Sequence, residues 1–209
     1  MDPATMHIAL VAAVVTAGLT LAGFLLLRKG QRRAELLGPA FELGTSRHGG
    51  FLRGAVDGMY RGYSCRYLIQ YPSQYDRGGA TLKMSIAAPG RWTAEIEKPG
   101  SRLLAKIGLV KDFEFGDREL DALLRFAGSD EGSLRSLFGT ESVRKALRAL
   151  ATSENFESVH VHPDRIDIRW SPRMRRLDEN PDALRTRLEL VTTLLTACGY
   201  PPATTATTP

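Results

Sequence analysis

The chain has 209 residues and a formal net charge of +5, from 28 Lys and Arg against 23 Asp and Glu. From residue 36 onward, 24 Lys and Arg stand against 21 Asp and Glu, so the excess positive charge is modest there. A nucleic-acid binder gathers its cations into a face that neutralises phosphates. We therefore expect no nucleic-acid partner, and the length suits one folded domain after a short N-terminal segment.

The first long feature is a run of 20 apolar or small residues without a charge, residues 8–27. A helix of that length measures about 30 Å, the hydrocarbon thickness of a bilayer. The seven residues before the run contain no Lys or Arg, and no clean A-x-A site follows it, which disfavours a cleaved signal peptide. The sequence therefore predicts a transmembrane anchor in residues 1–30.

Four cations follow the apolar run and none precedes it: Arg28, Lys29, Arg32 and Arg33. The flank that is richer in Lys and Arg remains in the cytoplasm. We therefore expect the N-terminus outside, the rest of the chain in the cytoplasm, and the protein in the inner (plasma) membrane. The lipid bilayer is then a predicted partner, with these four side chains as its contacts.

Residues 31–50 have the composition of a juxtamembrane linker. Gly38-Pro39 is expected to end any continuation of the anchor helix, and residues 45–50 are typical of a loop. From residue 51 the apolar period changes to two, so we expect the folded domain to begin there and to extend to residue 199.

Alternation of apolar and polar residues predicts four strands in the first half of this domain. They cover residues 51–56, 59–71, 81–88 and 91–97, with turns at Asp57-Gly58, Pro89-Gly90 and Lys98-Pro99-Gly100. In the second strand one face carries Tyr63, Cys65, Tyr67, Ile69 and Tyr71. The pattern is typical of an antiparallel meander with one face in water.

The second half mixes helix and strand signals. Residues 101–110 are ambiguous, residues 112–121 are expected to bridge back to the sheet, and residues 122–127 are predicted to form a strand. Ser129 or Asp130 is a candidate N-cap for a helix that ends at residue 138.

Three more elements and a tail complete the expected domain. Thr140 is the candidate N-cap of a helix over residues 141–151, and a hairpin turns at Pro163-Asp164. Asn180-Pro181 opens a helix that ends near Cys198, and residues 200–209 are expected to form a disordered tail. The predicted fold class is α+β, with an N-terminal transmembrane helix followed by an antiparallel sheet packed with a few helices.

His160 and His162 are two residues apart on a predicted strand, so both imidazoles point the same way and are candidate ligands. Asp164 and Asp167 are the nearby side chains available to complete a metal site, which needs three or four ligands. The simpler interpretation is that the two histidines lie on the solvent side of an amphipathic strand.

Asp117 and Asp121, with Glu114 and Glu119, place four carboxylates within eight residues. Such a group suits acid–base chemistry or a divalent cation. The run lacks the D-x-D-x-D-G pattern of a calcium loop, however, and Asp117 stands where a helix cap is expected. We keep Asp117 and Asp121 as candidate ligand-binding residues beside this structural interpretation.

The two cysteines, Cys65 and Cys198, are far apart and belong to no C-x-x-C motif. In a reducing cytoplasm both are expected to be free thiols that behave as small buried hydrophobes. No spacing implies a base for a nucleophile at Ser64-Cys65, and no phosphate-binding or dinucleotide motif occurs. The sequence thus predicts no catalytic residue, no cofactor and no resident metal.

The segment Phe115-Gly116-Asp117-Arg118-Glu119-Leu120-Asp121, followed by residues 124–130 and Leu137-Phe138, resembles a pattern that recurs in uncharacterised bacterial proteins. These are single-pass membrane proteins with a cytoplasmic domain of unknown function. The likeness covers about residues 51–170, and Leu120 stands where the pattern has a Phe. The resemblance implies no activity, substrate or catalytic residue.

Our leading hypothesis from the sequence is a membrane-anchored protein whose cytoplasmic domain binds a protein partner. An alternative is a lipid- or small-ligand-sensing domain at the membrane surface, which would use residues 28–33 and the basic run 173–176. A third is an enzyme that uses the aspartates or the histidine pair.

Overall fold

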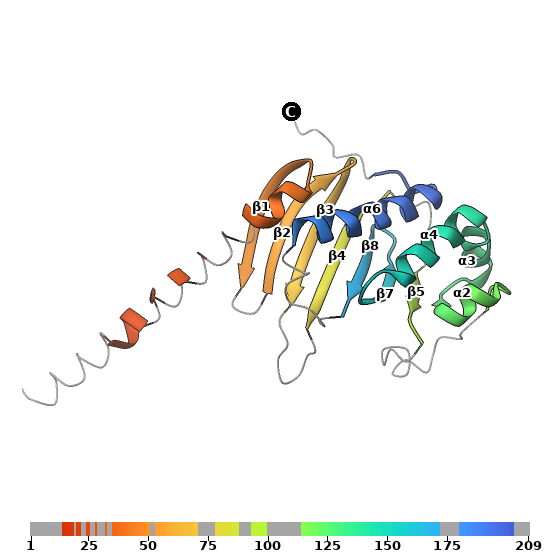
Figure 1. Ribbon diagram of the computed structural model, residues 1–209, viewed down its shortest axis with the longest axis horizontal. Coiled ribbons are helices and arrows are strands. Elements are labelled where there is room, and N and C mark those ends of the chain that lie inside the picture. Colours follow the sequence, from red (N-terminus) through yellow and green to blue (C-terminus); the bar gives the residue numbers. More distant parts are fainter. Residues whose placement is uncertain are drawn as a thin grey trace, which may run out of the picture.

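The computed structural model describes residues 14–18, 20–21, 24–25, 28, 32, 35–50, 53–70, 78–87, 93–99, 114–171 and 180–202, with the backbone alone for residues 43–50, 53 and 54. Within these residues, eight strands form one sheet in the order β1-β2-β3-β4-β8-β7-β5-β6 (Figure 1). Every neighbouring pair is antiparallel.

The strands are β1 (Leu43–Gly50), β2 (Arg53–Tyr60), β3 (Tyr63–Gln70), β4 (Gly79–Ser85), β5 (Ala94–Glu97), β6 (Arg125–Gly128), β7 (Phe156–Val161) and β8 (Arg165–Trp170). The helices are the 3₁₀ turn η1 (Gly38–Ala40) and α2 (Arg118–Leu123), α3 (Glu131–Phe138), α4 (Glu141–Thr152) and α6 (Pro181–Ala197). Helix α6 lies across the middle of the sheet, with α4 beside it and α2 and α3 against α4 (Figure 1). The helices thus form one layer on one face of the sheet.

The predicted transmembrane helix is wrong. Among the described residues, no helix combines the length and the apolar character needed to cross a bilayer. Of the predicted span 8–27, only residues 14–18, 20, 21, 24 and 25 belong to the described part of the chain. A span needs about 20 residues of apolar helix, and the described helical residues do not meet that requirement. The fold class that began with this helix, and the single-pass membrane placement derived from it, are corrected accordingly.

The predicted turn at Asp57-Gly58 is also wrong, because both residues lie inside β2. The chain reverses at Arg61-Gly62, whose φ angles of 49° and 81° match a hairpin turn that follows the twist of the strands. Gly58 serves packing instead. A Cβ at this position would lie 2.5 Å from Cγ of Phe41, so only glycine lets that ring rest on β2.

Residues 45–50, predicted as a loop, form most of β1. The preceding residues join the core as well: Leu37 and Phe41 are buried, and Arg185 of α6 donates a hydrogen bond of 2.9 Å to the Pro39 carbonyl. The glycine-rich sequence of β1 shows no alternation, so its strand conformation depends on pairing with β2, which no local pattern reveals.

A helix stands where the sequence predicted the start of a strand at residue 122. The Asp117 side chain accepts the N–H of Leu120 at 3.1 Å and begins α2, so the strand β6 starts only at Arg125. The other caps agree with the sequence. Asp130 caps α3, and Thr140 is the N-cap residue of α4, although its side chain makes no capping hydrogen bond.

Helix α6 begins as predicted, since the Asn180 side chain accepts the N–H of Asp182 at 2.9 Å. The chain stays packed after α6, where the sequence predicted a disordered tail. Tyr200 is buried, its carbonyl accepts the Tyr63 hydroxyl at 2.7 Å, and Pro202 pairs with Ile86. Residues 203–209 lie outside the described part of the chain.

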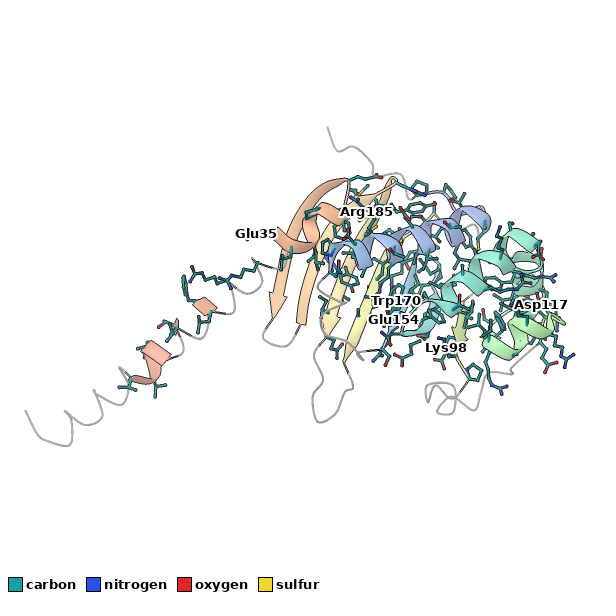
Figure 2. All side chains as sticks on the ribbon, in the orientation of Figure 1. Glu35, Lys98, Asp117, Glu154, Trp170 and Arg185 are labelled. Carbon is teal, nitrogen blue, oxygen red and sulfur yellow. The ribbon has the colours of Figure 1, made fainter. Side chains whose placement is uncertain are left out.

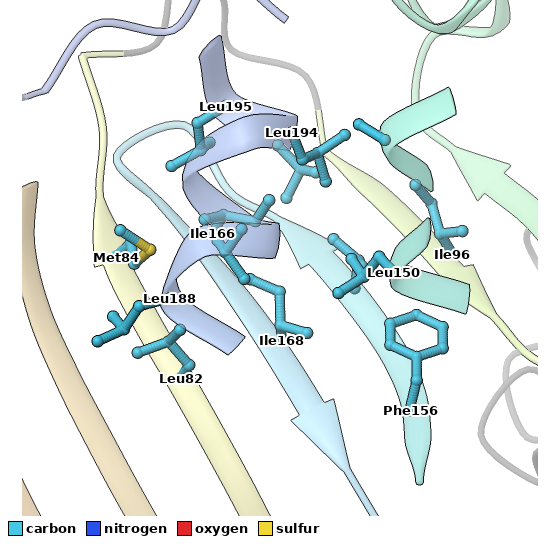
Figure 3. Close-up of a cluster of buried hydrophobic side chains, with 14 of the residues drawn as sticks. Leu82, Met84, Ile96, Leu150, Phe156, Ile166, Ile168, Leu188, Leu194 and Leu195 are labelled. Carbon is cyan, nitrogen blue, oxygen red and sulfur yellow. The ribbon is translucent and has the colours of Figure 1, made fainter. Parts of the chain in front are cut away.

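The core lies between α6 and the two central strands, β4 and β8. Figure 3 shows the side chains that meet there: Leu188, Leu194 and Leu195 of α6, Leu82 and Met84 of β4, and Ile166 and Ile168 of β8. All are almost completely buried. Burial of one such side chain contributes about 1.5–3 kcal/mol relative to its exposure, so this contact anchors the helical layer to the sheet.

One cation shares this buried side of α6. Arg187 is 6% exposed, and its guanidinium carbon lies 4.8 Å from the ring centroid of Trp170. It also donates a hydrogen bond to the Tyr67 hydroxyl. The aromatic face and the hydroxyl replace part of the water that the cation loses on burial.

The fit of Phe41 against Gly58 predicts that Gly58→Ala destabilises the protein by about 1–3 kcal/mol, because the ring must move to admit a methyl group. Gly132→Ala is the matched control: it lies in α3, where its new Cβ meets only Asp130 at 3.4 Å, and helix propensity favours alanine there. Urea unfolding followed by circular dichroism measures both. Equal stability of Gly58→Ala and the wild type would contradict this packing.

Candidate binding surfaces

Asp117 and Asp121 lie at the start of α2 and bind groups of their own chain. One Asp117 oxygen accepts the capping N–H, and the other lies 2.6 Å from the Arg148 guanidinium of α4 (Figure 2). The Asp121 carboxylate accepts the N–H groups of Phe115 and Gly116, each at 2.9 Å. In this arrangement both carboxylates hold the loop before α2 in place, and Asp117 ties it to α4.

His160 and His162 lie on the face of the sheet opposite the helices. Their neighbours Val159 and Val161 pack under α6, and side chains alternate between the faces along a strand. The histidines therefore share a face as predicted, but the fold separates them from Asp117 and Asp121 in the helical layer. Among the described residues, no group of three or more His, Cys, Asp and Glu is arranged to hold a metal ion.

His160 joins Ser158 and Glu95 in a row that the sequence did not reveal. Its Nε2 lies 3.1 Å from the Ser158 Oγ, and its Nδ1 lies 3.6 Å from the Glu95 carboxylate. The order serine, histidine, acid is that of a nucleophilic triad. Ser158 is completely buried, however, so its hydroxyl has no path to a substrate, and the row holds β5 and β7 together.

A line of charged side chains crosses the sheet on this face. Direct cross-strand neighbours run from β2 to β5 with one residue on each strand: Asp57, Arg66, Lys83, Asp167, His160 and Glu95. We call this line the charged rung. Arg66 meets Asp57 at 2.6 Å, and Lys83 meets Asp167 at 3.2 Å. Opposite charges at facing positions stabilise a sheet by about 0.2–1 kcal/mol per pair.

Asp167 is the centre of the charged rung. Besides Lys83, its carboxylate has the Arg165 guanidinium at 3.3 Å and the His162 ring at 3.7 Å. Burial, followed by the nearby Arg165, lowers the pKa of His162 below its usual value. His162 is therefore mostly neutral at neutral pH, and Lys83 and Arg165 supply the positive charge that balances Asp167.

Both thiols are free; Cys65 is buried, as the sequence predicts, whereas Cys198 is partly buried. Cys65 faces the helical layer from β3 and Cys198 ends α6, and burial raises the pKa of each thiol to about 12. Both are therefore protonated at neutral pH and poor nucleophiles. A cavity of about 10 Å³ beside Cys198, between the sheet and α6, has an apolar lining and room for about one water molecule.

Large apolar side chains are strongly exposed near the N-terminus. Among the described residues, those more than half exposed are Val14, Val15, Leu21, Phe24, Leu25 and Leu36. We call residues 14–36 the apolar segment, after these side chains. The hydroxyl of Thr20 donates to the carbonyls of Thr16 and Ala17, so this polar group is satisfied by the backbone of the preceding turn.

The predicted lipid contacts fall on the same stretch. Arg28 and Arg32 are exposed, whereas Lys29 and Arg33 lie outside the described residues. Their contact with lipid stays a prediction. Of the basic run 173–176, no residue belongs to the described part of the chain.

Comparison with known proteins identifies no family. No family model matches the sequence, and no curated protein matches it. A solved structure described as the mycobacterial trehalose monomycolate transport factor A, TtfA, is similar over 83% of this chain and 97% of its own, with 12% identity and a TM-score of 0.47. A likeness at that level carries no functional argument.

Sequence reasoning missed Glu95 and Ser158, which the structure places beside His160. Sequence reasoning could have found Ser158, because residues two apart on a strand share a face. Sequence reasoning could not have found Glu95, because its approach to His160 depends on the pairing of β5 with β7, strands that are far apart in the chain. The charged rung is completed in the same way, because the pairings of β4 with β8 and of β5 with β7 join strands that are distant in sequence.

The two functions of Asp117 predict an acid-dependent loss of stability. The N–H of Leu120, followed by Arg148, holds the pKa of Asp117 below its usual value. The stabilising effect is therefore complete above the unfolded-state pKa of about 3.9 and is lost as pH falls through the lower folded-state pKa. In Asp117→Asn the amide oxygen still caps α2, so the variant should be less stable than the wild type at pH 7, and this difference should shrink below about pH 4.

Urea unfolding at pH 7 and pH 3 tests this, with Glu154→Gln as the control. Glu154 also loses a negative charge in that variant, but its side chain makes no hydrogen bond or ion pair with the described residues. A difference between Asp117→Asn and wild type that is unchanged from pH 7 to pH 3 would refute the assigned ion pair.

Proposed function

We propose that this protein acts by binding another protein, and that the apolar segment is its docking surface. The observation that carries the proposal is the contrast in exposure. Val14 is 65% exposed and Phe24 is 58% exposed, whereas the described large hydrophobic side chains of the sheet and its helices are buried or partly buried. An apolar surface of this kind marks an interaction site, because association removes it from water.

The chemistry of the segment suits an apolar helix or groove of the partner. Leu21 and Leu25 are four residues apart, so they lie on one side of the helix. A Cβ placed on Gly18 would meet no described atom within 4 Å, which leaves room for close approach there. Each apolar Å² removed from water contributes about 25 cal/mol, so even a few of these side chains give measurable affinity.

The partner-binding proposal predicts a specific photo-crosslink. A benzophenone amino acid at Leu21 of the full-length chain, irradiated in its native cells, should give a discrete protein adduct. The same amino acid at Glu154, which Figure 2 places in the folded part of the chain away from the apolar segment, should not give that adduct. Leu25→Asp should reduce the yield of the Leu21 adduct by about tenfold or more, because burial of a charge in an apolar contact is costly.

The composition of the adducts decides the result. The same protein captured from Leu21 and Phe24, absent at Glu154 and lost in Leu25→Asp, would support the proposal. Adducts with lipid alone, or an identical protein pattern at Glu154, would overturn it. The lipid result would favour the alternative of a lipid-sensing domain.

A further inference from the structure

The long edge strand β1 presents an open backbone. It pairs with β2 on one side over Leu43–Gly50, and among the described residues no strand pairs with its other side. The register is irregular between Leu43 and Ser46 and regular from Ser46 to Gly50. The strand contains no Pro, and Arg47 is its one charged residue, so it has few of the side chains that commonly protect a sheet edge from another chain.

The other edge of the sheet is built differently. Strand β6 has four residues, lies directly between α2 and α3 in the chain, and contacts α3. A short edge held between helices is a common protection against added strands, so β1 is the edge at which a partner strand has room.

Charge distinguishes the possible occupants of β1. Residues 43–53, which cover β1 and the start of β2, contain Arg47 and Arg53 and no Asp or Glu, so this cationic stretch holds a formal charge of +2. Glu42, the acid just before β1, accepts the N–H of Arg61 at 2.7 Å. A second copy of the chain would bring two such cationic stretches together, whereas an acidic segment would complement the charge.

We propose that β1 binds an extended acidic segment of the partner protein as a ninth strand of the sheet. Main-chain hydrogen bonds from the outer side of β1 supply affinity, and the cationic stretch 43–53 selects for Asp and Glu. The inference rests on the proposed function in that the partner is a protein. It concerns β1 rather than the apolar segment, so a failed crosslink at Leu21 and a failed test at β1 are separate results.

The test measures binding of a labelled peptide, acetyl-(Glu-Val)₄-amide, to the full-length chain by fluorescence anisotropy, with amide hydrogen exchange to locate it. We expect binding that weakens with salt and slower exchange in residues 43–50. Two control peptides separate the causes: one with Lys for Glu, and one with Pro for every Val, which removes half of the N–H donors and keeps the charge.

Charge-reversal variants test the recognition on the side of the protein. Arg47→Glu, within β1, should weaken the affinity for the acidic peptide by about fivefold or more. Arg135→Glu, an exposed position of α3, is the matched control and should leave the affinity within about twofold. The comparison of the three peptides on wild-type protein does not depend on either variant folding.

Several results would overturn the proposal. One is that the acidic peptide does not bind at about 1 mM, and another is that the proline peptide binds equally well. A third is that peptide binding slows amide exchange only in residues 28–37, and the last is that the protection of β1 increases with the concentration of the protein without any peptide. The last result would identify a second copy of the chain as the occupant. The proposal is supported if only the acidic peptide binds, if its binding slows amide exchange in β1, and if Arg47→Glu weakens that binding.

Discussion

The contact between α6 and strands β4 and β8 is the constraint on which the rest of the structure depends. Leu188 and Leu195 of the helix and Ile168 of the sheet have no exposed surface, and the helix spans the strands that join the two halves of the sheet. β4 comes from the first meander and β8 from the second hairpin, and they are neighbours. Because α6 lies over both, the burial of one apolar stripe fixes the helical layer and the strand order together.

That single helical layer leaves the opposite face of the sheet to polar side chains. The charged rung follows from it, since alternation sends Lys83, Asp167 and His160 away from the face that holds Leu82, Ile168 and Val159. Its pairs balance one another across strands, so the charged rung carries little net charge. The exposed large apolar side chains lie near the N-terminus, in the apolar segment, and residues 28–53 hold +4 of the formal net charge of +5.

Local sequence signals predicted much of the body. The face shared by Tyr63, Cys65 and Tyr67, the hairpin at Pro163-Asp164, and α6 with its Asn180 cap all depend on residues close together in the chain, and all agree with the structure. The misses depend on distant contacts. Asp57-Gly58 has the composition of a turn, but glycine is needed at position 58 because the ring of Phe41, 17 residues earlier, leaves no room for a Cβ. Strand β1 has no pattern of its own, and the neighbours of His160 are set by strand order. The transmembrane prediction rested on the apolar run of the sequence alone, and among the described residues no helix is long and apolar enough to cross a bilayer.

Native-state hydrogen exchange of the backbone amides tests the central contact most directly. If burial of α6 on β4 and β8 holds the fold together, their slowest amides should exchange only through global unfolding, with the same free energy of opening as the slowest amides of α6. The edge strand β1 should open at a lower free energy. An opening free energy for α6 well below that of β4 and β8, with the sheet still protected, would show that the helix is peripheral and contradict this account.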